Sequence, residues 1–274
     1  MYKSDLLPNR TLQIGPLAVQ ISTPDSGLLE QVGLVYPGFI IPPVPQPDLC
    51  LEVSCAAVSQ APRWEELQVS LAEEQMLYTA PGCQGRLAAN GSAHLDVFAS
   101  HPFLETDLFL RIGLGFLALR RGGVLLHTAG VVQQGRAYLF FGHSGSGKTT
   151  AARLSAPRQV LNDDLVLLLP APGAASTAWL ACATPFTNPS QVAPGPGQAP
   201  LAGIFRLLKD TQVYVRPMRP AAALAELLSC VPLLAVLPQE MARGFAILTR
   251  LTQQTQCGYL HFRKDDSFWQ QIAP

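Results

Sequence analysis

The chain has 274 residues, 48% of them hydrophobic and 14% charged, a balance that supports a packed core and excludes a disordered chain. Its 19 Lys and Arg residues equal its 19 Asp and Glu residues, so the formal net charge of zero gives no electrostatic basis for binding nucleic acid or an anionic membrane. Proteins with a net charge near zero are less soluble, so this composition is compatible with a chain that buries part of its surface in a homo-oligomer.

The first part of the chain, residues 1–122, is predicted to be rich in strands and to end in a helix. Strands are predicted at residues 11–14, 17–21, 49–53 and 75–79. The first two flank Gly15-Pro16 and predict a hairpin. Apolar residues at helical spacing predict a helix over 104–121, which Gly122-Gly123 ends.

The second part, residues 123–274, is predicted to be an α/β core built on a mixed sheet. Its predicted strands cover residues 124–132, 136–141, 165–169 and 259–262, and its predicted helices cover 147–156 and 221–229. Pro157 is expected to end the first of these helices and Pro220 to begin the second. The run Ala193–Pro200 is predicted to be a turn-rich loop.

A glycine-rich segment follows the strand at 136–141. Residues Gly142–Thr149 match the phosphate-binding pattern Gly-x-x-x-x-Gly-Lys-[Ser/Thr]. Glycines let successive backbone N–H groups turn toward one anion, and the following helix presents further free N–H groups. Lys148 is predicted to contact the β- and γ-phosphates and Thr149 to bind Mg²⁺. ATP with Mg²⁺ is therefore the expected ligand, contacted by Gly142, His143, Ser144, Gly145, Ser146, Gly147, Lys148, Thr149 and Thr150.

The strand at 124–132 joins the strand at 136–141 through a very short link, which predicts antiparallel pairing. If Gln134 and Gly135 form the turn, paired residue numbers sum to 269, and His127 lies opposite Gly142 with Cα atoms about 5 Å apart. His127 would then act near the phosphates. The alternative is a structural histidine bonded to nearby backbone, which a shift of one residue in the turn would favour.

Two adjacent carboxylates, Asp163 and Asp164, precede the apolar run Leu165–Leu169. Carboxylates that enter a buried strand are costly unless a metal or hydrogen-bond donors compensate. Since neighbouring strand residues point to opposite faces, one carboxylate could face the transferred phosphate and the other the metal. The sequence leaves open which does which, and a solvated turn before the strand is the alternative.

The cysteine pattern and the apolar runs bear on the compartment. The chain has six cysteines but no Cys-x-x-Cys pair, so a zinc or redox site is not expected. No secretory signal is recognisable, and the most apolar run, Cys230–Leu237, is broken by Pro232 and too short to span a bilayer. We therefore expect a cytoplasmic protein with reduced thiols.

Three segments together resemble the HPr kinase/phosphorylase family, which shares its core with ATP-dependent phosphoenolpyruvate carboxykinase. They are Leu125–Val131, Leu139–Thr150 and Leu161–Asp164. The resemblance implies that Lys148 binds phosphate, that Thr149 and Asp164 lie at the metal, that Asp163 is the general base and that His127 lies near the transferred group. The family's Glu-x-Arg-Gly signature is missing, and Thr184–Thr187 stands about where it would be, so the resemblance does not extend to HPr as the acceptor.

The expected function is that of an ATP- and Mg²⁺-dependent kinase for a Ser or Thr hydroxyl on a peptide or small protein. Two alternatives belong to other classes: a non-catalytic ATP-binding partner protein that controls an assembly, and a small-molecule kinase. The Asp163-Asp164 pair favours an enzyme, because a protein that only binds nucleotide has no need of a base beside its phosphate loop.

Overall fold

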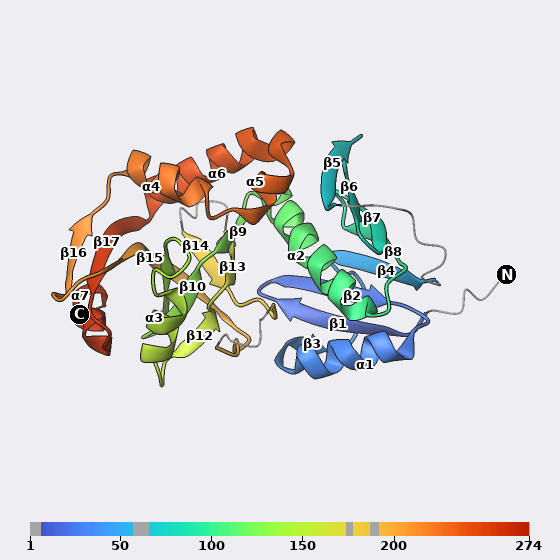
Figure 1. Ribbon diagram of the computed structural model, residues 1–274, viewed down its shortest axis with the longest axis horizontal. Coiled ribbons are helices and arrows are strands. Elements are labelled where there is room, and N and C mark those ends of the chain that lie inside the picture. Colours follow the sequence, from blue (N-terminus) through green and yellow to red (C-terminus); the bar gives the residue numbers. More distant parts are fainter. Residues whose placement is uncertain (1–6, 57–65, 174–177, 187–191, 274) are drawn as a thin grey trace. The chain divides into compact units, whose positions relative to one another are not determined.

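The computed structural model describes residues 7–56, 66–173, 178–186 and 192–273. The chain is an α/β protein that divides into two compact units, Met1–Leu117 (unit 1) and Ala118–Pro274 (unit 2). Figure 1 shows the elements of both. The division falls inside one long helix, whereas the sequence placed the boundary at Gly122-Gly123. Thr187, the last residue of the segment compared with the Glu-x-Arg-Gly signature, lies outside the described residues.

Unit 1 contains a mixed sheet in the strand order β3-β1-β2-β4-β8-β7-β6-β5. The strands are β1 Asn9–Ile14, β2 Leu17–Ser22, β3 Ile40–Ile41, β4 Leu49–Cys55, β5 Gln68–Ala72, β6 Gln75–Ala80, β7 Cys83–Ala88 and β8 Ser92–Val97. The predicted hairpin at Gly15-Pro16 is confirmed, since Ile14 pairs with Leu17. The strands predicted at 49–53 and 75–79 are also present, as parts of β4 and β6.

The helices of unit 1 are α1 (Ser26–Val35), a 3₁₀ turn at Pro37–Phe39, and the first part of α2 (Pro102–Arg120), which corresponds to the helix predicted over 104–121. The Asp25 side chain caps α1, because its carboxylate accepts a 3.0 Å hydrogen bond from the Leu28 N–H. Phe109 of α2 packs edge-on against Tyr78 with ring centroids 5.3 Å apart. This contact joins the helix to β6 through the hydrophobic core.

Unit 2 contains a second mixed sheet in the order β12-β10-β11-β15-β14-β13-β9, with β17 paired to β15 and β16 paired to β17. The strands are β9 Val124–His127, β10 Ala129–Gln133, β11 Arg136–Phe141, β12 Gln159–Asn162, β13 Leu165–Pro170, β14 Trp179–Cys182, β15 Gln198–Lys209, β16 Tyr214–Pro217 and β17 Gln256–Phe262. The predicted strand at 259–262 is the end of β17.

The predicted hairpin register is confirmed between β10 and β11. Its pairs run from Gln133 with Arg136 to Ala129 with Phe140, and every pair sums to 269. The single strand predicted over 124–132 is wrong, because the chain divides at Thr128. The residue before the division, His127, belongs to β9 and pairs with Leu165 of β13. The expected pairing of His127 with Gly142 therefore does not form.

The helices of unit 2 are α3 (Lys148–Leu154), α4 (Pro220–Leu228), α5 (Pro232–Val236), α6 (Met241–Gln254) and α7 (Trp269–Ile272), with 3₁₀ turns at Pro238–Glu240 and Asp266–Phe268. In Figure 1, α4 and α6 lie along one side of the sheet and α3 lies on the other. Phe205 and Leu207 of β15 share a buried core with Ala151 and Ala152 of α3. Arg206 lies between them in sequence and forms an ion pair with Glu226 of α4. This alternation places α3 and α4 on opposite faces of β15.

Within the described ranges, no helix has the length and apolar content needed to cross a membrane.

Candidate functional site

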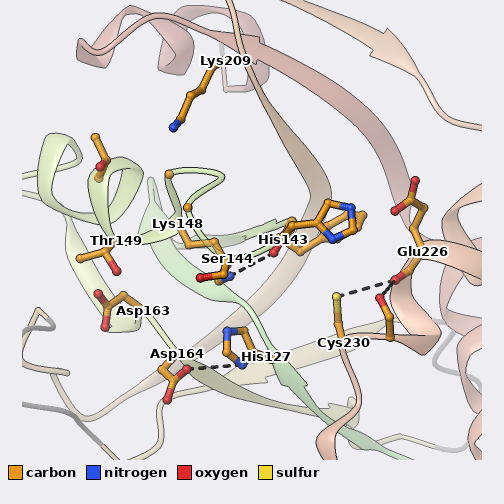
Figure 2. Close-up of a pocket in the computed structure, with 16 residues that line it drawn as sticks. His127, His143, Ser144, Lys148, Thr149, Asp163, Asp164, Lys209, Glu226 and Cys230 are labelled. Carbon is orange, nitrogen blue, oxygen red and sulfur yellow. Dashed lines mark hydrogen bonds and ion pairs between the residues drawn. The ribbon is translucent and has the colours of Figure 1, made fainter.

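A cavity of about 660 Å³ lies in unit 2 at one edge of the sheet. β10 is antiparallel to both β11 and β12, and β15 is parallel to β11, so β11, β12 and β15 all end at this edge. Open α/β sheets bind ligands beyond the carboxyl ends of their strands. Three segments meet here (Figure 2): the loop after β11, the acidic turn after β12 and the end of β15.

The loop after β11, residues 142–147 (the glycine loop), has three glycines in the left-handed region. Their φ angles are +150° at Gly142, +76° at Gly145 and +110° at Gly147. A Cβ on Gly142 would lie 2.7 Å from the Ser146 hydroxyl oxygen, and one on Gly147 would lie 2.7 Å from the Phe262 ring. Glycine is therefore required at these two positions by both conformation and space.

Three polar residues follow the glycine loop on the first turn of α3 and line the cavity, Lys148, Thr149 and Thr150. Lys148 reaches back over the loop, and its ammonium donates a 3.0 Å hydrogen bond to the Gly142 carbonyl. Thr149 faces the cavity, and Figure 2 places its side chain next to that of Asp163. The first turn of α3 thus gives the cavity a primary amine and, beside a carboxylate, the Thr149 hydroxyl.

Asn162 at the end of β12 shapes the acidic turn. Its side-chain oxygen accepts hydrogen bonds from the N–H groups of Asp164 (2.7 Å) and Leu165 (2.9 Å). Its amide nitrogen donates to the carbonyls of Thr184 (3.0 Å) and Phe186 (2.8 Å). One buried amide therefore ties the turn to the segment that follows β14.

The two aspartates form the connection between β12 and β13 and do not belong to either strand. The expectation that they enter a strand is wrong, because Asn162 closes a turn at that point. The alternation of side chains along a strand therefore does not explain why the Asp163 and Asp164 side chains differ in their surroundings. Nor is this a solvated turn, because Asp163 is only 2% exposed.

Asp163 is buried at the cavity wall. One of its carboxylate oxygens accepts a 3.3 Å hydrogen bond from the Val192 N–H. The other oxygen, Oδ1, is buried without a hydrogen-bond partner in the described part of the chain. Because a buried acceptor left unsatisfied is costly, Oδ1 is suited to a ligand that enters the cavity.

Asp164 lies beside His127, with 3.5 Å between its Oδ1 and the histidine Nδ1, longer than a good hydrogen bond. The histidine side chain is 48% exposed and that of Asp164 13%, and both residues line the cavity. Burial lowers the pKa of His127, as does the Lys148 ammonium, while the Asp164 carboxylate raises it. Burial is the largest of these effects, and it favours the neutral imidazole.

β15 and the α4 region supply a further wall that the sequence did not indicate. Arg206 contacts the His143 Nε2 at 3.1 Å and the Glu226 carboxylate at 3.0 Å, so it bridges the glycine loop and α4. Lys209 and Cys230 also line the cavity. Burial raises the pKa of the Cys230 thiol. These residues follow no recognisable motif, and only the parallel register of β15 with β11 brings them to the loop.

The structure gathers almost all the predicted site residues in one place. The predicted residues that line the cavity are His127, Gly142, His143, Ser144, Gly145, Gly147, Lys148, Thr149, Thr150, Asp163 and Asp164. Ser146 does not line it, because its hydroxyl is buried under the loop.

The described part of the chain offers a metal ion few ligands at this cavity. Among the described residues, no group of three or more His, Cys, Asp and Glu side chains could hold one. Mg²⁺ does not need such a group, since it is commonly bound through one or two carboxylates together with substrate phosphates and water. An Asp163 carboxylate with one unpartnered oxygen, next to the Thr149 side chain, therefore fits Mg²⁺ that brings further ligands of its own.

Comparison with known proteins adds no assignment: no family model matches the chain, and no match was found among curated proteins.

Proposed function

We propose that the chain is an ATP- and Mg²⁺-dependent kinase that transfers phosphate to a Ser or Thr hydroxyl of a peptide or small protein. The observation that carries the proposal is one shared cavity. The glycine loop with Lys148 and Thr149 opens onto it, and so do the two carboxylates that follow Asn162, from a separate part of the chain. A kinase needs both parts, since the phosphates must be held while a hydroxyl loses its proton.

In this proposal the loop N–H groups and Lys148 hold the phosphates. Lys148 would exchange its bond to the Gly142 carbonyl for one to a phosphate oxygen, which is a charge-assisted and stronger interaction. Thr149 and Asp163 would hold Mg²⁺, which neutralises charge on the phosphates.

The placement of the carboxylates favours the opposite division of roles from the one that the family resemblance implies. Asp163 is buried beside Thr149, whereas the side chains of Asp164 and His127 are 13% and 48% exposed and so more accessible to an acceptor. Asp164 would accept the proton of the acceptor hydroxyl as its oxygen bonds to the γ-phosphorus and the bond to ADP breaks. His127, neutral through burial, would position the Asp164 carboxylate.

The test combines calorimetry of Mg-ATP binding with transfer of label from γ-labelled ATP to candidate peptides, read by mass. Lys148→Ala should weaken ATP binding by about 100-fold, because it removes a charge-assisted contact worth roughly 3 kcal/mol. Its melting temperature should stay near that of the wild type, since Lys148 makes one bond to its own loop. Equal ATP affinity in the two proteins would refute the site.

The same assays separate the carboxylates and the alternative functions. Asp164→Asn should lose transfer but keep ATP binding and its Mg²⁺ dependence, whereas Asp163→Asn should need more Mg²⁺ for the same affinity. The reverse pattern would restore Asp163 as the base. ATP binding without transfer to any peptide or protein would support a non-catalytic nucleotide-controlled partner, and transfer only to a metabolite would support a small-molecule kinase.

A further inference from the structure

Lys209 is the last residue of β15 and lies beside the glycine loop. Phe141, the last residue of β11, pairs with Arg206, so β15 runs three residues beyond the point where the loop begins. Phe205 and Leu207 face the core that contains α3. Lys209 follows them in alternation and so belongs to the same face of β15 as the loop. Figure 2 shows its ammonium directed into the cavity.

The Lys209 ammonium has no hydrogen bond or ion pair to any residue that the structure describes. The carboxylate next to it in sequence is already engaged. Asp210 accepts hydrogen bonds from the N–H groups of Thr211 (2.7 Å) and Gln212 (3.2 Å), and its other oxygen contacts the His261 Nδ1 at 2.8 Å. The other cation of β15 near the loop, Arg206, is paired with Glu226. Lys209 therefore brings an uncompensated positive charge to the cavity.

The strand order places Lys209 and the acidic turn on opposite sides of the loop. The order is β12-β10-β11-β15, so the turn after β12 and the end of β15 flank the loop that follows β11. Figure 2 agrees, with Lys209 across the loop from Asp163 and Asp164. If phosphate is transferred beside the carboxylates, an anion that extends along the loop presents its other end to Lys209.

We propose that Lys209 binds the phosphates that are not transferred, the part that ATP and ADP share. This rests on the proposed function, since it takes the phosphate chain to lie along the glycine loop. Lysine is suited to this role, because its ammonium is a compact charge with three donors on a flexible stem and needs no fixed geometry. Lys148 of α3 and Lys209 of β15 would then hold one polyphosphate from two elements, and Lys209 would favour retention of ADP after transfer.

The experiment measures the dissociation constants of Mg-ADP and Mg-ATP by calorimetry for the wild type, Lys209→Ala, Lys209→Arg and Lys264→Ala. Lys264 is the matched control, an exposed lysine of unit 2 that does not line the cavity. Lys209→Ala should raise both constants by the same factor, about tenfold, for one lost charge-assisted contact. Lys209→Arg should recover most of the affinity, and Lys264→Ala should match the wild type.

The outcomes separate this inference from the proposed function. If the wild type binds both nucleotides and Lys209→Ala binds them equally well, the inference is overturned and the kinase proposal stands. A loss of affinity for ATP but not for ADP would mean that Lys209 contacts the transferred phosphate. That result would also overturn the inference. A wild type that binds neither nucleotide overturns both. Lys209 is an exposed side chain at a strand end, and matching melting temperatures would confirm that the variants fold.

Discussion

Glycines with left-handed backbone conformations occur in both units, and one from each unit differs in its surroundings from the other. In unit 1, Gly91 (φ +91°) lies between β7 and β8, and a Cβ there would be only 2.0 Å from the Asp48 carbonyl oxygen. In the glycine loop of unit 2, a Cβ on Gly145 (φ +76°) would meet no described atom within 4 Å. The first glycine permits close packing of backbone, and the second leaves room in a cavity.

Helices α1 of unit 1 and α3 of unit 2 also differ, in how the N–H groups of their first turns are capped. In unit 1, α1 follows β2, and its first turn is capped by the Asp25 carboxylate. In unit 2, α3 follows β11 and the glycine loop, and Gly147 at its start has no side chain to cap it. At α1 a side chain satisfies a free N–H group, whereas the first turn of α3 has no side-chain cap and lies next to a cavity. The starts of these two helices therefore differ: one is closed by a side chain, and the other is left open beside a cavity.

The largest expected effect is on folding and comes from the glycines. Gly91→Ala should lower the free energy of unfolding by about 3 kcal/mol or more, because the new Cβ overlaps backbone as well as occupying a left-handed conformation. Gly145→Ala should lower the free energy of unfolding by only about 1 kcal/mol. Its new Cβ would occupy a left-handed conformation but would not overlap any described atom. Urea denaturation measures both. The comparison between the units would break down if Gly145→Ala were the more damaging change.

An intermediate effect is expected at the cap of α1. Asp25→Ala should lower the free energy of unfolding by about 1 kcal/mol, since the Leu28 N–H would lose its acceptor. Asp25→Asn is the control, because an asparagine oxygen can still accept this bond. Urea denaturation of the three proteins gives the values. If Asp25→Asn were as destabilising as Asp25→Ala, the carboxylate charge and not the cap would be the stabilising feature.

The smallest effect concerns His127 and pH. Burial lowers its pKa in the folded state, so as the pH falls below about 6.5 the unfolded chain takes up the proton more readily. The folded state should therefore lose stability on acidification, and His127→Gln should lose less between pH 7 and pH 5. The difference should be small, since the side chain is 48% exposed. Urea denaturation at both pH values tests this, with His101→Gln, an exposed histidine of unit 1, as the control.

Local sequence patterns predicted the features that local geometry determines. The two-residue turn at Gln134-Gly135 predicted the β10–β11 register. The spacing of His127, the glycine loop and the two aspartates predicted that they lie together, and all of them line one cavity. The division at Thr128 was not predictable, because it depends on pairing of His127 with Leu165, far along the chain. Lys209 was missed for the same reason, since the register of β15 on β11 leaves no local signal.

Several helices were missed, α1 and α6 among them, and for α6 the signal is present. The buried positions of α6 include Gly244, Ile247, Leu248 and Leu251, which recur at helical spacing. By contrast, no periodic pattern in the sequence shows that Asn162 closes the acidic turn. Its side chain is held by the Thr184 and Phe186 carbonyls, which lie in a distant segment. Periodicity could have located the helix, whereas only the folded chain shows the turn.

The Asn162 side chain makes five hydrogen bonds to the acidic turn and to the segment after β14, and they also bear on the kinetics of binding. The turn is ordered when the protein folds, so its loss of conformational entropy precedes any encounter with a ligand. Association at Asp163 and Asp164 would then be limited by diffusion and orientation instead of by rearrangement of this turn. Loosening the turn by replacing Asn162 would slow the formation of the complex as well as weaken it.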